Sequence, residues 1–379
     1  MNDARLPADA AQPHRPRAPR TARAMRAARL AALLALLLGL GGCANLGYYW
    51  QSVSGHLQLM RSARPVSEWL ADPATPPALK RRLELAQRIR RYAVTALDEP
   101  DNASYHRYAD LHRSAAVWNV VAAPEFSLTL KTWCFVVVGC VSYRGYYDEA
   151  AAEREAAGLA ADGLEVSVYG VPAYSTLGWM NWAGGDPLLN TFIDYPDGEL
   201  ARIIFHELAH QVLYVPGDTV FNESYATTVE RLGAAQWLVD EGTPAEREQY
   251  ARVEARRSAF RALTMATRAE LAQIYASFGP EAVDRSAELA MKKEAMKNFR
   301  QRYAELKSSW GGYAGYDRWV AGANNAAFGA LAAYDTLVPD FEALFAHEGR
   351  SWPRFFAAVK KLAKLPKDER NKALEAYRG

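Results

Sequence analysis

The stretch that decides the fold is Phe205-His206-Glu207-Leu208-Ala209-His210. It lies inside an apolar segment, 199–214, whose acidic start and Pro-Gly end predict a well-defined helix. Histidines four residues apart project from one face of a helix, so both imidazoles can reach a single ion. Glu207 points to the neighbouring side, where its carboxylate can take a proton from a metal-bound water. The motif therefore predicts a helix that carries a metal site together with its general base.

A third ligand is needed, because the motif alone arises by chance in roughly one or two chains per hundred of this composition. Glu223 follows the Pro-Gly break, with twelve residues between it and His210. Residues 218–227 predict a second helix that returns antiparallel to the first and brings Glu223 to the two histidines. Two histidines and one glutamate leave an open coordination position, which is typical of a catalytic rather than a structural zinc site.

The residues 206–226 resemble the gluzincin metallopeptidases, in which His-Glu-x-x-His is followed by Asn-Glu-x-x-Ala on the next helix. The wider text is similar to the putative aminopeptidase family of bacterial lipoproteins, over most of residues 45–345; it includes 139–146, 173–179, Asp186-Pro187 and 221–224. The resemblance implies Zn²⁺ bound by His206, His210 and Glu223, and Glu207 as the base. It also implies aminopeptidase activity and a zincin-like small sheet packed on the motif helix. The spacer of twelve residues is shorter than the gap of about eighteen in better-known gluzincin aminopeptidases.

The remaining sequence predicts an α+β fold with a large, mostly helical C-terminal half. Runs rich in β-branched residues predict strands at 117–122, 132–143 and 164–171. Helical spacing predicts helices at 77–97 and between Asp148 and Gly163, and from Pro244 onward the whole chain is expected to be helical. We therefore divide the chain into a signal peptide (1–42), a tether with a helical segment (43–114), a zincin-like catalytic core (115–243) and a helical region packed on that core (244–379).

The N-terminus has the layout of a secretory signal peptide. Seven arginines precede an apolar run, 30–40, that is too short to span a bilayer comfortably. Leu40-Gly41-Gly42-Cys43 resembles the lipobox of bacterial lipoproteins, which implies a lipid on Cys43 and anchoring in a membrane. Ala44, rather than Asp, follows the cysteine, so the resemblance implies the outer membrane, with the protein facing the periplasm. The alternative is a short anchor helix with an unrelated cysteine, and Met25 is a possible true start.

Charge and cysteine content limit the partners further. The formal net charge is +2, and it becomes negative once the arginine-rich leader is removed, so no electrostatic footprint for nucleic acid is expected. Cys134 and Cys140 form an even pair in an exported chain, which favours a disulfide over two small buried hydrophobes. The sequence predicts no particular oligomeric state.

Substrate groups are less well marked. The segment 174–179 precedes the motif helix and is our candidate for an edge strand that pairs with a peptide substrate. Tyr174 and Tyr225 are candidate hydroxyl donors to the charge that develops on the scissile carbonyl, with aromatic packing as the alternative for each. The expected function is a zinc-dependent peptidase, and the family resemblance narrows it to an aminopeptidase. The alternatives are an endopeptidase, which lacks a clamp for a free α-amine, and a non-catalytic zinc-containing lipoprotein that acts as a binding or structural module.

Overall fold

The computed structural model describes residues 47–135, 139–173, 175–178, 181–279 and 285–378. The signal segment 1–42, Cys43 and Tyr174 lie outside the described residues, and the predictions about them stay predictions. The chain divides into two units, Met1–Val53 and Ser54–Gly379. Residues 47–53 of the first unit are helical. The second unit contains all of the candidate site.

The central sheet of the second unit has three antiparallel strands in the order β6-β3-β7. They are β3 (Val117–Pro124), β6 (Arg144–Tyr146) and β7 (Leu164–Val171). The register pairs Asn119 with Tyr169, and Trp118 with Tyr146 on the other side. Helix α4 (Glu149–Ala161) begins at Asp148, whose side chain accepts a hydrogen bond from the Ala151 amide. The predicted strands at 117–122 and 164–171 and the helix between Asp148 and Gly163 are thus confirmed.

The expected strand at 132–143 is divided into shorter pieces. Strands β4 (Trp133–Phe135) and β5 (Gly139–Val141) form a separate antiparallel pair, in which Cys134 lies opposite Cys140. The structure has a disulfide between these two cysteines. Gly139 has a positive φ of 75°, and an added Cβ would lie 3.0 Å from the Gly217 amide nitrogen. This glycine therefore allows β5 to approach the turn that joins the two helices of the site.

A second small sheet and two helices form the other part of the N-terminal half. Strand β2 (Arg107–Ala109) pairs antiparallel with β1 (Arg64–Pro65) and parallel with β8 (Leu188–Leu189). Helix α2 (Val66–Ala71) follows β1, and α3 (Pro77–Leu97) matches the helix predicted at 77–97. A 3₁₀ turn, η1 (Asn181–Ala183), precedes β8.

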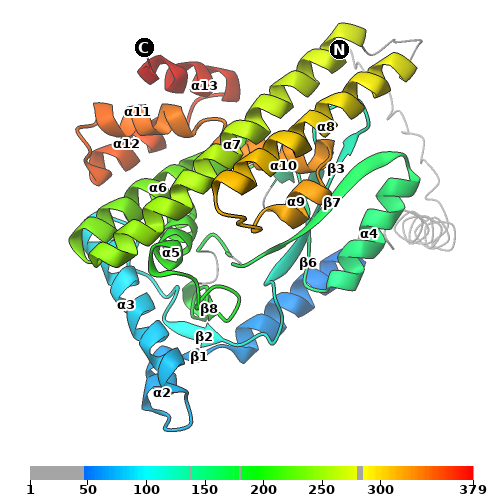
Figure 1. Ribbon diagram of the computed structural model, residues 1–379. Helices are drawn as coiled ribbons and strands as arrows, with labels where there is room; N and C mark the ends of the chain where they lie inside the picture. The colour runs from blue at the N-terminus through cyan, green and yellow to red at the C-terminus, as the bar shows by residue number, and fades with distance from the viewer. Residues whose placement is uncertain (1–46, 136–138, 174, 179–180, 280–284, 379) are drawn as a thin grey trace, which may run out of the picture. The chain divides into compact units, whose positions relative to one another are not determined.

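Two long helices pack side by side at the centre of the fold (Figure 1). Helix α5 (Asp197–Val212) contains the histidine motif, and α6 (Thr219–Asp240) contains Glu223. Gly217, with a φ of 81°, allows the tight connection between them. Asp218 then caps α6, because its side chain accepts from the Phe221 amide at 3.3 Å. The turn and the cap make α6 return along α5.

The rest of the described chain is helical, as predicted from Pro244 onward. The elements are α7 (Pro244–Phe278), α8 (Arg285–Ser309), α9 (Asp317–Ala321), α10 (Asn325–Asp335), α11 (Val338–His347), α12 (Trp352–Leu362), α13 (Lys367–Glu375) and η2 (Ala376–Arg378). Helices α7 and α8 form a long hairpin, and α10 packs against both α6 and the central sheet. The fold is therefore α+β with a mostly helical C-terminal half. None of the described helices is both long enough and apolar enough to cross a membrane.

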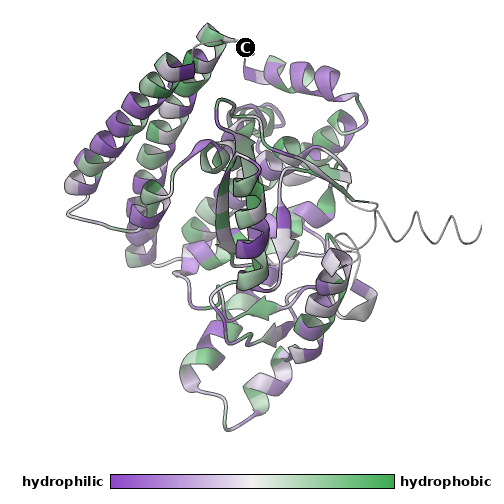
Figure 2. Cartoon of the chain, turned by 90° about the vertical axis from the view of Figure 1, so that its right-hand side faces the viewer, coloured by the Kyte–Doolittle hydropathy of each residue, from purple (hydrophilic) through white to green (hydrophobic). Residues whose placement is uncertain are grey.

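One hydrophobic core joins segments that are far apart in the sequence. It extends from Leu59 near the start of the second unit to Leu374 in α13, and it includes the buried sides of α3, α5 and α6. A separate cluster fills the space between α7, α8 and α10. In Figure 2 the long helices of the α7–α8 hairpin alternate between hydrophobic and hydrophilic residues, as expected for helices with one buried side. Helices α5 and α6 are therefore held on several sides by apolar packing.

Candidate active site

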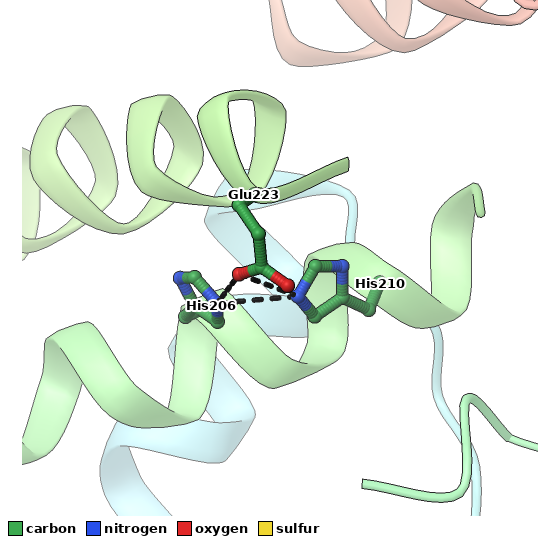
Figure 3. A group of neighbouring side chains, drawn as sticks. All are labelled: His206, His210 and Glu223. Carbon is green, nitrogen blue, oxygen red and sulfur yellow. Dashed lines mark hydrogen bonds and ion pairs between the residues drawn. The ribbon is translucent and has the colours of Figure 1, made fainter. Parts of the chain in front are cut away.

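Helices α5 and α6 bring three side chains of the predicted site together (Figure 3). The Nε2 atoms of His206 and His210 are 3.1 Å apart. Oε2 of Glu223 lies 3.3 Å from Nε2 of His206 and 3.7 Å from Nε2 of His210. All three side chains are largely buried. Among the described residues, this is the one group of His, Cys, Asp or Glu side chains whose ligand atoms converge in this way.

The three separations have the dimensions of a tetrahedral zinc site. With bonds of about 2.1 Å, two ligands of a tetrahedral ion are about 3.4 Å apart. The observed values of 3.1, 3.3 and 3.7 Å spread around that distance. A point in the plane of the three atoms is about 2.0 Å from each, so an ion displaced slightly from that plane is at zinc bonding distance from all of them. Two imidazole nitrogens and one carboxylate are also donors that Zn²⁺ accepts, and the set leaves a position open.

The other nitrogen of His206 faces a carboxylate that the sequence analysis did not identify. Its Nδ1 is 3.0 Å from Oε2 of Glu230, although the angle is poor for a hydrogen bond. Glu230 also contacts the buried Arg202, which is 2.7 Å from Glu254 of α7. Burial would raise the pKa of Glu230, but the charge of Arg202 and the contact with His206 lower it to about 2. Carboxylates in this position fix the orientation of metal-binding histidines.

The same contacts favour the protonated form of His206 and the ionised form of Glu223. Burial would lower the pKa of His206, yet the close contacts with the carboxylates of Glu223 and Glu230 and their charges outweigh burial and raise it. Burial would also raise the pKa of Glu223, but the two histidines lower it to about 2. Glu223 is thus held as a carboxylate, the form that binds a metal.

Glu207 has a different environment from Glu223, although both lie near the histidines. Burial raises its pKa, while the charges of His206 and His210 and a hydrogen bond from Ser175 act in the opposite direction. The net effect is an increase. A carboxylate with a raised pKa is a better proton acceptor near neutral pH, which suits the role of a general base.

Two tyrosines lie beside the convergent histidines, and neither was predicted from the sequence. Tyr334 of α10 stacks on His206, with ring centroids 6.4 Å apart and planes inclined by 29°. Tyr214 lies edge-on to His210 at 6.3 Å. The negative charge of Glu223 is the largest cause of the raised pKa of Tyr334, and burial adds to it. Tyr334 therefore keeps its hydroxyl proton near neutral pH, and its ring lies beside His206.

Tyr225 does not belong to this group. Its ring is fully buried between Phe341 and Phe355. Two residues along a helix correspond to a rotation of about 200°, so Tyr225 lies on the opposite side of α6 from Glu223. The prediction of Tyr225 as a donor to the scissile carbonyl is wrong, and the alternative of aromatic packing describes this residue.

The expected edge strand at 174–179 is also wrong over its described part. Residues 175–178 form a turn, in which Leu177 has a φ of 54° and Gly178 a φ of 78°. A strand requires negative φ at successive residues, so these values exclude it. The turn is nevertheless near the end of α5, because the Thr176 hydroxyl donates to Asp186, which also accepts from Gln211, the residue after His210. Trp179, like Tyr174, lies outside the described residues.

Comparison with known proteins is consistent with this arrangement. No curated protein and no solved structure matches the chain. Residues 47–374, however, match a family described as Putative aminopeptidase. The matched range contains α5 and α6, the central sheet and nearly all of the helical C-terminal half. The chain therefore belongs to the Putative aminopeptidase family.

Proposed function

We propose that this protein is a zinc-dependent aminopeptidase with His206, His210 and Glu223 as the metal ligands. The observation that carries the proposal is the spacing of their three ligand atoms, 3.1, 3.3 and 3.7 Å. Membership of the family supports a peptidase. The separate environments of Glu207 and Glu223, one with a raised and one with a lowered pKa, support a division between base and ligand.

The protein residues have defined tasks in such a reaction. Zinc, when bound, polarises the scissile carbonyl and lowers the pKa of a water molecule. Glu207 would take a proton from the attacking water and later deliver it to the leaving amine. The Tyr334 hydroxyl can donate to the oxygen of the scissile carbonyl as negative charge develops there. Glu230 holds the His206 ring in the orientation that presents Nε2 to the site.

We also propose that the mature protein is an outer-membrane lipoprotein that faces the periplasm. The support is the arginine-rich leader, the apolar run 30–40 and the Leu-Gly-Gly-Cys sequence that ends at Cys43. A lipid on Cys43 would tether the first unit directly, because the described helix begins only four residues later, at Gly47. The disulfide between Cys134 and Cys140 is consistent with an oxidising compartment.

A panel of peptides tests the proposed activity. The purified chain is assayed with zinc against pairs of peptides that differ only in a free or acetylated N-terminus. We expect cleavage of the free peptides alone. Equal cleavage of both would identify an endopeptidase, and cleavage of neither would favour the non-catalytic lipoprotein.

The variant Glu207→Gln separates catalysis from metal binding. It keeps the shape of the side chain and one acceptor oxygen but removes the base, so we expect normal zinc content and a kcat lower by about three powers of ten. Full activity in this variant would exclude Glu207 as the proton acceptor. Asp194→Asn, an exposed acid ahead of α5, is the matched control and should leave kcat unchanged.

A further inference from the structure

Arg202 is a buried arginine of α5 to which the proposed reaction assigns no task. It lies four residues before His206, so the two side chains are on the same face of the helix. Only 7% of the Arg202 side chain is exposed, and a charge buried this deeply requires partners. One terminal nitrogen contacts Oε1 of Glu230 in α6, and the other lies 2.7 Å from Oε2 of Glu254 in α7. The guanidinium therefore connects three helices.

The first partner of Arg202 is the carboxylate that lies behind His206. Oε1 of Glu230 contacts the guanidinium, while Oε2 of the same carboxylate lies 3.0 Å from Nδ1 of His206. One carboxylate thus spans two side chains that are one turn apart on α5. The Glu230 side chain is only 14% exposed, so its interactions with charged groups are screened little by water and salt. A displacement of this carboxylate away from Arg202 would also change its position relative to the imidazole.

The second partner of Arg202 belongs to a ring of ion pairs. Oε2 of Glu254 also accepts from Nη1 of Arg257, one turn further along α7, at 2.7 Å. Nη2 of Arg257 donates to Oε2 of Glu199 at 2.5 Å, and Glu199 lies three residues before Arg202 in α5. Two charges on α5 and two on α7 therefore alternate in sign around the ring. The ring holds the Arg202 guanidinium at a fixed place beside Glu230.

Net stability is a weak explanation for this arrangement. Removing two opposite charges from water costs free energy that largely offsets their attraction, and apolar side chains of similar size often pack as well. The chain of contacts has instead one consistent geometric result. It places an ionised carboxylate at Nδ1 of His206, while Nε2 of the same ring lies 3.3 Å from Oε2 of Glu223. A carboxylate in that place orients a histidine ligand.

We propose that Arg202 is a positioning residue for the proposed zinc site: it holds the Glu230 carboxylate against Nδ1 of His206, and Glu254 of α7 holds Arg202. The role of His206 as a ligand belongs to the proposed function, and the inference rests on that function to this extent. Loss of the direct partner of a metal ligand typically lowers metal affinity by about 10- to 100-fold. Arg202 acts one contact further out, so its replacement should have a smaller effect of the same sign.

Two variants disturb the contacts of Arg202, and a third serves as the matched control. Arg202→Lys keeps the charge but presents one nitrogen to two carboxylates, so it cannot hold both as the planar guanidinium does. Glu254→Gln removes the charge behind Arg202 from a side chain that is 24% exposed, and it serves if Arg202→Lys does not fold. In the control, Arg82→Lys, the arginine pairs with Asp197 at the start of α5, at 2.5 Å. The control thus removes a guanidinium from the far end of the same helix.

The first measurement is the zinc dissociation constant, from competition of the metal-free chain with a chromophoric chelator. We expect it to increase about 3- to 10-fold in Arg202→Lys, at least about threefold in Glu254→Gln and less than about twofold in Arg82→Lys. In the Glu230→Gln background, Arg202→Lys should change it by less than about twofold, because Arg202 acts through Glu230. An increase below about threefold in Arg202→Lys, an equal increase in Arg82→Lys, or multiplied effects in the double variant would overturn the proposal.

The second measurement needs no metal. Crystal structures of the metal-free chain and its variants show directly where the Glu230 carboxylate lies. We expect Oε2 of Glu230 to be more than about 4 Å from Nδ1 of His206 in Arg202→Lys, and to keep its place in Arg82→Lys. An unchanged contact in Arg202→Lys would overturn the proposal. A wild-type chain that binds no zinc, together with the expected movement of Glu230, would instead refute the proposed function and leave the role of Arg202 toward Glu230 intact.

Discussion

Replacement of Glu230 should weaken zinc binding even though Glu230 is not a ligand. Its Oε2 lies 3.0 Å from Nδ1 of His206, and its other oxygen contacts Arg202, which is only 7% exposed. In Glu230→Gln the amide group must face either the ring nitrogen or the guanidinium, so one donor is left opposite another donor. The negative charge that increases the basicity of His206 is also lost.

The expected size of the effect follows from these contacts. Loss of a carboxylate that orients a metal-binding histidine typically reduces affinity by about 10- to 100-fold, which corresponds to about 1.4 to 2.7 kcal/mol. Arg202 keeps its contact with Glu254 at 2.7 Å, so the helix packing should survive. We therefore expect the loss in zinc affinity to exceed any loss in thermal stability of the metal-free chain.

A competition titration with a chromophoric chelator measures the zinc dissociation constant. Glu241→Gln, an exposed position at the end of the same helix, is the matched control and should bind zinc as the wild type does. A Glu230→Gln dissociation constant within about twofold of the wild-type value would refute the reasoning, because it would mean that His206 needs no carboxylate behind it.

Three further predictions concern stability, pH and anchoring. Arg370 and Asp218 form an ion pair in which each side chain is 4% exposed. In urea titrations, Arg370→Met should lower the unfolding free energy by about 3 kcal/mol, and Asp218→Asn in the same chain should recover much of the loss. An unchanged unfolding free energy in Arg370→Met would contradict this. Burial raises the pKa of Asp186 from 3.8 to about 6, so the folded chain keeps a proton that the unfolded chain has lost. As the pH rises from about 4 to about 6, the contribution of Asp186 to stability therefore decreases. Over this range the unfolding free energy of Asp186→Asn, relative to that of the wild type, should rise by up to about 3 kcal/mol. A difference that does not change with pH would disprove the shift in pKa. Cys43→Ser should release the protein from the membrane fraction or leave the precursor unprocessed, whereas unchanged fractionation and processing would point to a helical anchor.

The secondary structure around α5 and α6 was predictable because it depends on local signals. The apolar spacing of α5, the Pro-Gly break and the cap at Asp218 are all within a few residues of the feature that they determine. The same reasoning could have excluded Tyr225, since it lies about 200° around the helix from Glu223. It could also have identified Glu230, which is seven residues, or two helical turns, beyond Glu223 and so on the same face.

The rest of the site depends on contacts between distant segments. Tyr334 is more than a hundred residues beyond His206 in the sequence, and only the packing of α10 on α6 brings their rings together. Residues 174–179 have the composition of a strand, but hydrogen bonds to Asp186 stabilise a turn at residues 175–178 instead. Buried polar networks of this kind leave no periodic pattern, so the sequence does not show them.

Zinc stoichiometry tests the central claim most directly. The chain is expressed with zinc, dialysed and analysed for bound metal, alongside His206→Ala, Glu223→Ala and the control His112→Asn, whose imidazole is largely exposed. Asparagine suits the control because His112 has a positive φ of 50°. We predict one zinc per chain in the wild type and the control, and substoichiometric zinc in the other two variants. Stoichiometric zinc in both His206→Ala and Glu223→Ala would contradict the assignment of these side chains as ligands.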